Sequence, residues 1–152
     1  MTTSFRVAVR VLLLDPSSRV LLFEGRDLSD VNDTVRFWFT VGGGVEGDES
    51  LAQAAERELA EETGLKGCYM AGPFHRREVD FLNHGEPLQQ VEHFFAARIT
   101  DPLNLHRDDW PELEVAAMTQ SRWWSTADLT DSGVIFFPED LPDLVEIAAA
   151  LV

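Results

Sequence analysis

Acidic side chains are concentrated between residues 46 and 62 of this 152-residue chain. The stretch contains a single base, Arg57, and the acids Glu46, Asp48, Glu49, Glu56, Glu58, Glu61 and Glu62. Carboxylates at this density repel one another unless a cation lies among them. Hard carboxylate oxygens are the ligands that Mg²⁺ and Mn²⁺ prefer, and no His or Cys lies nearby to indicate zinc. The stretch therefore predicts a site for a divalent cation.

A helix from Leu51 to Thr63 would position these acids. Ser50 can cap its start together with Gln53, and Gly64 stands where a left-handed residue ends a helix. At about 100° per residue, one face beside the apolar side carries Glu58, Glu61 and Glu62. A run of Glu on a helix is usually a solvated face. Here the three cluster with one another and occupy the last turns, where the helix dipole disfavours anions, so the pattern favours cation binding.

The spacing of these residues resembles the complete Nudix box, G-x5-E-x7-R-E-U-x-E-E-x-G-U, in which U is a bulky aliphatic residue. Gly43 and Glu49 match its first two fixed positions, and residues 57–65 (RELAEETGL) match the rest. A motif with so many constrained positions at fixed spacing is a specific signal. The resemblance extends weakly to most of the chain, including residues 122–129, which are similar to a segment near the end of many Nudix domains.

This resemblance implies an α/β fold of the α+β kind, a Nudix-like α/β/α sandwich with a mixed β-sheet between helices. Residues 1–152 are expected to form a single Nudix hydrolase domain. The implied enzyme is a Nudix pyrophosphohydrolase that uses Mg²⁺, with Mn²⁺ as a substitute. It would hydrolyse a phosphoanhydride bond in a nucleoside diphosphate linked to another moiety. The substrate class stays open among nucleoside triphosphates, nucleotide sugars such as ADP-ribose, and dinucleoside polyphosphates.

The resemblance also implies roles for individual residues. The metal ligands would be Glu58, Glu61, Glu62 and a backbone carbonyl at Gly43. Catalytic roles fall on Arg57, which would hold a carboxylate such as that of Glu49 in position, and on Glu61 or a glutamate outside the box as the general base. In the family an extra glutamate often completes the metal cluster or acts as base. The candidates are Glu114 first, then Glu92 and Glu112.

Three arginines are candidates for binding the phosphates of the substrate. Arg26 and Arg36 flank a polar, Asp-rich segment, and Arg76 lies in a predicted hairpin near Glu78. An arginine can bind phosphate through paired hydrogen bonds. Surface solubility is the alternative for Arg26 and Arg36, and an exposed ion pair is the alternative for Arg76.

Apolar and β-branched residues predict strands at 5–14, 19–24, 37–41, 67–72, 74–82 and 89–99, with Pro73 separating the fourth from the fifth. Residues 122–129 predict a short strand that enters a small helix. A final helix is expected from Leu141 to Leu151. Trp124 is interpreted as a core residue and not as a platform for a nucleotide base.

The chain carries 12 basic and 27 acidic residues, a net charge of −15. This charge argues against binding nucleic acid polymers or anionic membranes through general electrostatics. It would also repel a polyphosphate unless bound divalent cations invert the local field. We therefore expect a small-molecule partner, a nucleoside diphosphate derivative. The single cysteine and the lack of a long apolar run favour a cytoplasmic protein. Apolar edge strands favour a homodimer.

Three alternatives remain open from the sequence. A purely structural acidic helix would predict that divalent ions have no effect on stability. A catalytically silent Nudix-fold nucleotide sensor would predict a damaged box, whereas this box is intact. A diphosphate isomerase with the same box needs a Cys and Glu pair, and Cys68, the only cysteine, has no obvious partner. A small buried apolar role is the simpler interpretation of Cys68.

Overall fold

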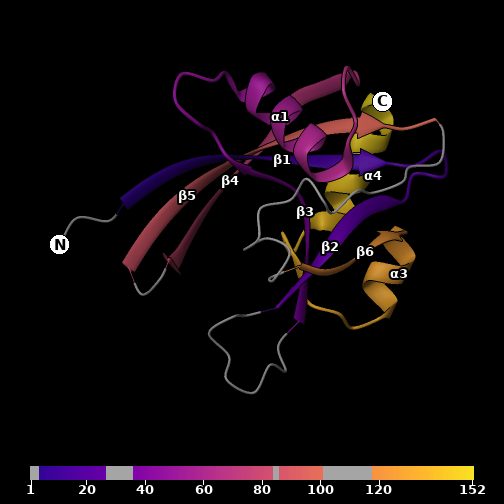
Figure 1. Ribbon diagram of the computed structural model, residues 1–152. Coiled ribbons are helices and arrows are strands. Elements are labelled where there is room, and N and C mark those ends of the chain that lie inside the picture. The colour runs from indigo at the N-terminus through magenta and orange to yellow at the C-terminus, as the bar shows by residue number, and fades with distance from the viewer. Residues whose placement is uncertain (1–3, 27–35, 84–85, 101–117) are drawn as a thin grey trace.

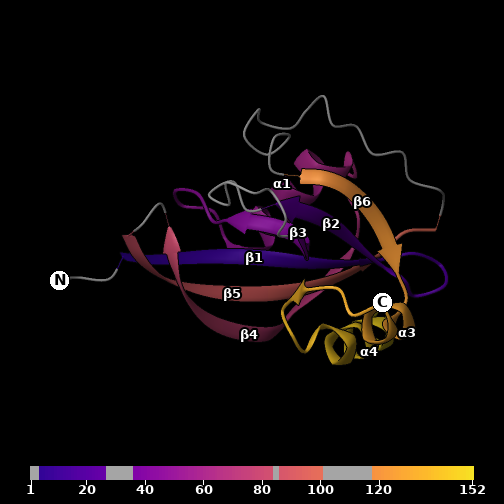
Figure 2. The same ribbon diagram turned by 90° about the horizontal axis from the view of Figure 1, so that it is seen from below.

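A mixed β-sheet runs through the protein, with helices on both of its faces (Figures 1 and 2). The computed structural model describes residues 4–26, 36–83, 86–100 and 118–152. Among these residues the strands are β1 (Ser4–Leu14), β2 (Val20–Arg26), β3 (Arg36–Gly44), β4 (Met70–Asn83), β5 (Glu86–Arg98), β6 (Met118–Trp124) and β7 (Phe136–Phe137). The helices are α1 (Leu51–Thr63), α3 (Thr126–Asp131) and α4 (Leu141–Leu151).

The strand order is β4-β5-β1-β2-β3-β7, and β6 pairs with β2. Strand β1 is parallel to β5, and β3 is parallel to β7, while the other pairs are antiparallel. Strand β1 also pairs with β3, from Ala8 opposite Gly44 to Val11 opposite Val41. This pairing brings the glycine-rich end of β3 beside the first half of β1.

The two faces of β1 are both buried, because its residues alternate between two hydrophobic cores. Val9, Val11 and Leu13 pack in one core together with Ala54, Ala55 and Leu59 of α1. Leu12 and Leu14 pack in a second core with Leu141, Leu144, Val145 and Ala148 of α4. Figure 2 shows α1 on one side of the sheet and α3 and α4 on the other. The predicted mixed sheet between helices is confirmed.

Trp124 belongs to the core beneath α4, as predicted. Its side chain is 1% exposed, and its ring packs edge-on against Trp38 at a centroid distance of 5.0 Å. In this position the ring cannot stack on a bound nucleotide base.

The structure corrects one predicted break. Pro73 was expected to separate two strands, but β4 continues through it to Asn83. The register of β4 against β5 shifts between Ala71 and His75, so an irregularity in the pairing accommodates the proline, which has no N–H to donate. In the described part of the chain, none of the helices has the length and apolar character needed to cross a bilayer.

Candidate functional site

Helix α1 begins and ends as its sequence predicts. Ser50 Oγ accepts a hydrogen bond from the Gln53 N–H at 3.1 Å, and Gln53 Oε1 accepts one from the Ser50 N–H at 2.9 Å. At the other end Gly64 has a φ of 81° and donates its N–H to the Ala60 carbonyl. These caps fix which residues enter the helix and therefore which of its side chains face the sheet.

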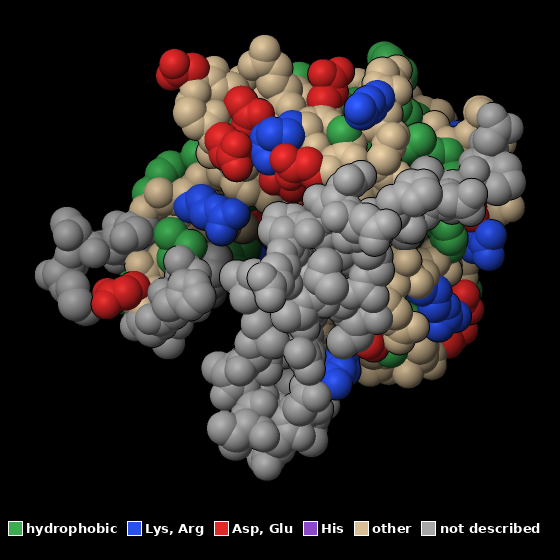
Figure 3. Space-filling view, in the orientation of Figure 1, with side chains coloured by type: hydrophobic (Ala, Val, Ile, Leu, Met, Phe, Trp, Pro, Cys, Tyr) green, Lys and Arg blue, Asp and Glu red, His purple; other side chains and the backbone are tan. Residues whose placement is uncertain are grey.

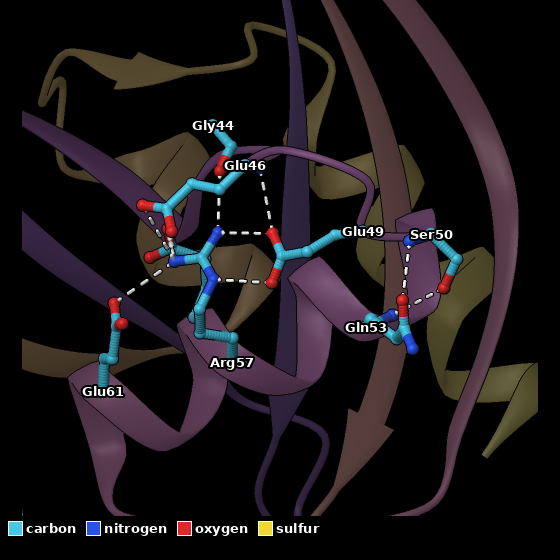
Figure 4. A network of polar contacts seen from close by, with 8 residues as sticks. Gly44, Glu46, Glu49, Ser50, Gln53, Arg57 and Glu61 are labelled. Atoms are coloured by element: carbon cyan, nitrogen blue, oxygen red, sulfur yellow. Dashed lines mark hydrogen bonds and ion pairs between the residues drawn. The ribbon is translucent and has the colours of Figure 1, made fainter.

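Arg57 lies at the centre of the charged cluster on α1 (Figure 4). Its Nε and Nη2 donate to the two carboxylate oxygens of Glu49 at 2.8 and 3.0 Å, and Nη2 also donates to the Gly44 carbonyl at 2.8 Å. Its Nη1 lies 2.9 Å from Glu58 Oε1 and 3.4 Å from Glu61 Oε2. A planar guanidinium presents these donors in fixed directions, so Arg57 ties the loop before α1 to the helix. The predicted contact with Glu49 is present, whereas the catalytic role of the pair stays a prediction.

The contact between Arg57 and Glu49 favours the charged form of both groups. The hydrogen bonds from Arg57, followed by one from the Glu46 N–H at 2.9 Å, lower the pKa of Glu49 below its usual value. The hydrogen bond to Glu49 is also the main reason why the pKa of Arg57 is raised. Each partner thus stabilises the ionised state of the other.

Glu58 is buried between α1 and the end of β3. Its residue is 6% exposed, and burial raises the pKa of its carboxyl group, although the hydrogen bond from Arg57 opposes this shift. A Cβ on Gly43 would come within 2.7 Å of the Glu58 carboxyl carbon. Gly43 therefore has to be glycine for Glu58 to reach this position.

Glu62 contacts the same segment, residues 42–44, which we call the glycine turn. Its residue is 1% exposed, and its Oε2 accepts a hydrogen bond from the Gly42 N–H at 3.2 Å. Glu61 differs, because its side chain is 46% exposed at the rim of the cluster. Figure 3 shows acidic side chains gathered around a basic one over α1. The structure thus brings two box glutamates, Glu58 and Glu62, to the glycine turn and leaves Glu61 more open to solvent.

The residues of this cluster fit a divalent cation by donor type and by location. Glu58, Glu61 and Glu62 offer hard carboxylate oxygens, and Gly43 lies against one of them. In the ranges that the structure describes, no three Asp, Glu, His or Cys side chains are already arranged to hold a metal ion. Glu58 is not arranged for a metal ion because it already has a cationic partner. One of its carboxylate oxygens faces the Arg57 guanidinium.

Glu92 is not part of this cluster. It lies in β5 two residues before Phe94, which packs in the core beneath α4, so strand alternation turns Glu92 to the face opposite α1. Its residue is 4% exposed. Its Oε2 accepts hydrogen bonds from Arg10 Nε at 2.8 Å and Gln90 Nε2 at 3.0 Å, and its Oε1 lies 3.3 Å from Arg77 Nη1. The structure therefore does not bring Glu92 to the box glutamates as a metal ligand or base.

The predicted phosphate-binding arginines lie at different places in the sheet. Arg26 and Arg36 are opposite each other at the end of the β2–β3 pair. Arg76 forms an ion pair with Glu78 at 2.9 Å, and both side chains are about half exposed, which matches the alternative of an exposed ion pair. The predicted loop before Arg36 and the candidates Glu112 and Glu114 lie outside the described residues.

Two arginines of β1 contact the glycine turn and were missed in the sequence. A Cβ on Gly44 would come within 2.8 Å of Arg6 Nε, and one on Gly42 would come within 2.9 Å of Arg10 Cδ. A signal was available, because Arg6 and Arg10 are polar residues four apart in an otherwise apolar strand. In a strand, an even spacing places both on one face.

Comparison with known proteins identifies the fold. The family model described as NUDIX domain matches residues 4–141. The MutT protein of Methanosarcina mazei Go1 is 19% identical with a TM-score of 0.65, over 99% of this chain and 96% of that one. The E. coli dihydroneopterin triphosphate pyrophosphohydrolase is 18% identical with a TM-score of 0.66, over 95% and 97%. The NUDIX domain of Shewanella oneidensis NrtR, complexed with ADP ribose, is 21% identical with a TM-score of 0.63, over 98% and 89%.

The matched family model spans most of the chain and includes the complete box, so the chain belongs to the Nudix family. Its class is that of a nucleotide pyrophosphohydrolase, as the sequence predicted. The family generally uses a divalent metal ion.

Proposed function

We propose that this protein catalyses the Mg²⁺-dependent hydrolysis of a phosphoanhydride bond in a nucleoside diphosphate linked to another moiety. Nucleoside triphosphates, nucleotide sugars such as ADP-ribose, and dinucleoside polyphosphates are the substrate classes. The observation that carries this proposal is the arrangement of the box. Arg57 binds Glu49 through two hydrogen bonds, while Glu58 and Glu62 both contact the glycine turn.

The residues of the chain prepare the site in distinct ways. Glu58, Glu61, Glu62 and the Gly43 carbonyl would hold Mg²⁺, which when bound lowers the pKa of water and screens the phosphate charges. Arg57 binds Glu49 and the Gly44 carbonyl, and thereby holds the loop before α1 and the end of the glycine turn against the helix. Glu61, or a glutamate outside the box such as Glu114, accepts the proton from the attacking water. The greater exposure of Glu61 supports this role, because its carboxylate is accessible to solvent.

Desolvation of Glu58 supports cation binding. A carboxylate that is buried loses much of its hydration, and this loss is offset only when a cation or hydrogen-bond donors approach it. Glu58 Oε1 accepts a hydrogen bond from Arg57, and the same oxygen is the atom nearest to the position of a Cβ on Gly43. Because residue 43 is glycine, no side chain displaces the carboxylate from the backbone at this point.

The proposal extends to partner, location and assembly. With a net charge of −15, we expect the enzyme to act on a small molecule and not on a nucleic acid polymer or a membrane. A single cysteine is compatible with a reducing compartment, and we expect the enzyme in the cytoplasm. Strand β4 forms one edge of the sheet and can pair with a copy of itself, giving a homodimer. Size-exclusion chromatography with light scattering measures the mass in solution, and we expect twice 17.1 kDa.

The test is hydrolysis of a panel of nucleoside triphosphates, ADP-ribose, other nucleotide sugars and dinucleoside polyphosphates, with Mg²⁺ and with Mn²⁺. Wild type is compared with Glu61→Gln and with Glu56→Gln, an exposed glutamate of the same helix. We expect metal-dependent turnover that is lost in Glu61→Gln and kept in Glu56→Gln. A folded wild type that binds metal and nucleotide but hydrolyses no member of the panel would instead support the sensor function.

Cation binding is tested separately by thermal unfolding. A ligand that binds only the folded state increases the free energy of unfolding, by about 2.7 kcal/mol at 100 times Kd, and therefore raises Tm. We expect millimolar Mg²⁺ or Mn²⁺ to raise the Tm of wild type and of Glu56→Gln but not of Glu62→Gln. No change in wild type would count against the assignment of the box glutamates.

The isomerase alternative requires a reactive thiol at Cys68. Burial raises the pKa of that thiol, and its Sγ lies 3.7 and 3.9 Å from the carbonyl oxygens of Tyr69 and Arg98. A thiol with a raised pKa is a poor nucleophile near neutral pH. We expect Cys68→Ser to keep full hydrolase activity.

A further inference from the structure

Arg10 packs against the glycine turn from the face of the sheet opposite α1. It alternates in β1 with Leu12, a member of the core beneath α4, and its Cα is paired with that of Gly42 in β3. Because a Cβ on Gly42 would come within 2.9 Å of Arg10 Cδ, the arginine side chain lies directly on this glycine. Its Nη1 also lies 3.4 Å from the Thr40 carbonyl. Arg10 thus contacts β3 on either side of Val41, next to the N–H that binds Glu62.

A buried carboxylate holds Arg10 in this position. Glu92 Oε2 accepts from Arg10 Nε at 2.8 Å and from Gln90 Nε2 at 3.0 Å, and Glu92 is 4% exposed. Hydrogen bonds between charged groups are stronger where water is excluded. If Arg10 turned into solvent, the buried charge of Glu92 would lose its closest cation, which is costly. The orientation of Arg10 is therefore strongly constrained.

From these contacts we propose that Arg10, held by Glu92, is a positioning residue that supports the glycine turn. Arg10 contacts the turn from the face of the sheet opposite α1, whereas Glu58 and Glu62 contact it from the α1 side. Glu92 then acts on the site through Arg10 and Gly42, although its own hydrogen bonds go to Arg10, Arg77 and Gln90 and not to the box glutamates. This inference rests on the proposed function where activity or Mn²⁺ affinity is the readout.

Arg77 offers a matched comparison within the same network. It binds the same carboxylate, at 3.3 Å from Glu92 Oε1, and its side chain is 20% exposed, against 22% for Arg10. Its other recorded ion pair joins Nη2 to Glu139 at 3.7 Å, just before α4. Neither of these acids lies in β3. Losing Arg77 should therefore weaken the network without releasing the glycine turn.

The experiment compares Arg10→Gln with Arg77→Gln in the full chain. Three quantities are measured: the exchange rate of the Gly42 N–H by NMR, the affinity for Mn²⁺, and kcat and KM on the best substrate. In Arg10→Gln we expect faster Gly42 exchange, an Mn²⁺ affinity about 10-fold weaker, and kcat lowered about 10-fold with a smaller change in KM, as found when groups that orient ligands are removed. In Arg77→Gln we expect all three within about twofold of wild type, even though Tm falls.

Glu92→Gln tests whether Glu92 acts through Arg10. It should change the three quantities in the same direction as Arg10→Gln. Combined with Arg10→Gln it should add little further loss, because the two residues would act as one unit. Additive losses would mean that Glu92 affects the site by another route and would overturn the proposed link.

The proposal would fail if Arg10→Gln and Arg77→Gln lost Mn²⁺ affinity and kcat equally, in proportion to the fall in their Tm. That result would show that the network only joins the strands. The proposal would also fail if Arg10→Gln kept the wild-type exchange of Gly42 and the wild-type Mn²⁺ affinity. Should Arg10→Gln not fold, Arg10→Lys and Arg77→Lys keep a charge beside Glu92 and give the same comparison. Gly42 exchange needs neither metal nor substrate, so an inactive wild type would count against the proposed function alone.

Discussion

Arg57 lies within 4.0 Å of four acidic side chains, but only Glu49 meets it through both carboxylate oxygens. The other contacts, to Glu46, Glu58 and Glu61, are single. A two-point contact fixes orientation as well as distance, so Glu49 defines the direction of the guanidinium. Arg57 is then left with one nitrogen, Nη1, for the carboxylates on its own helix.

Replacing Glu49 with Gln is expected to destabilise the protein in a pH-dependent way. Arg57 lowers the pKa of Glu49 in the folded state, so the unfolded state binds a proton first as the pH falls. The stabilising contribution is therefore fully present above the unfolded-state pKa of about 4.5 and is lost as the pH falls through the lower folded-state pKa. Urea unfolding should show Glu49→Gln to be less stable than wild type near neutral pH.

Urea unfolding repeated in acid tests whether the ionisation of Glu49 causes this difference in stability. The difference between wild type and Glu49→Gln should shrink once the pH is below about 4.5. Glu56→Gln is the control, because Glu56 is exposed and should show little difference at either pH. A difference for Glu49→Gln that is constant from neutral to acid pH would mean that its ionisation does not contribute to stability.

Substitution of Gly43 by Ala should disturb the site more than the fold. The new methyl group would collide with the Glu58 carboxyl group, which has to move away from the glycine turn. We expect a loss of metal-dependent turnover of at least about 10-fold, since displaced catalytic groups lose rate steeply. The control is Gly47→Ala, where a Cβ would meet nothing within 4 Å and only the φ of 52° is unfavourable. Equal activity of the two variants would contradict a role for the Gly43 contact.

The local part of the site could be predicted from sequence, and the long-range part could not. The shared face of Glu58 and Glu62 follows from helical periodicity, which needs only neighbouring residues. Arg10 and Glu92 are 82 positions apart, and their contact depends on the parallel pairing of β1 with β5. No local pattern encodes that pairing, so the sequence could not show that Glu92 binds Arg10.

At the scale of elements, both ends of α1 were predicted correctly because the residues that cap it can be recognised in the sequence. Ser50 and Gln53 satisfy N–H groups at the start, and Gly64 takes the left-handed conformation at the end. Strand β4 was predicted less well. A proline lacks an N–H, but a register shift lets the strand continue past Pro73, and that depends on its partner β5.

Removing the N-cap of α1 or that of α3 should destabilise the chain to a similar extent. Ser50→Ala and Ser125→Ala each delete a hydroxyl that accepts an N–H at 3.1 Å, at the start of α1 and α3 respectively. Each should cost about 1 kcal/mol, which lowers Tm by about 2–4 °C in a protein of this length. Thermal unfolding measures this loss.

The affinity for Mn²⁺ should distinguish the two variants. Only α1 carries the box glutamates, so we expect Ser50→Ala to weaken Mn²⁺ affinity and Ser125→Ala to leave it unchanged at a temperature where both are folded. If Ser125→Ala lost as much Mn²⁺ affinity as Ser50→Ala, general destabilisation and not the position of α1 would explain both.

At the scale of the whole molecule, the two cores share the strands that separate them. Strand β1 contributes Val11 to the core beneath α1 and Leu12 to the core beneath α4, and both residues are 0% exposed. Neither core can lose its packing without exposing a face of β1. The chain is therefore predicted to unfold as a single domain.

Leu59→Ala tests this coupling from the α1 side. Leu59 is 2% exposed, and truncating a buried leucine typically costs 2–5 kcal/mol. We expect methyl NMR signals of Val41, in the same core, and of Val145, in the core beneath α4, to disappear at one urea concentration in wild type and at one lower concentration in the variant. Leu144→Ala, from the other core, should shift both signals in the same manner.

The contradicting outcome is that Leu59→Ala lowers the urea midpoint of the Val41 signal and leaves that of the Val145 signal unchanged. The two sides of the sheet would then unfold as independent units. In that case the contact of Arg10 with the glycine turn could not depend on the stability of both cores.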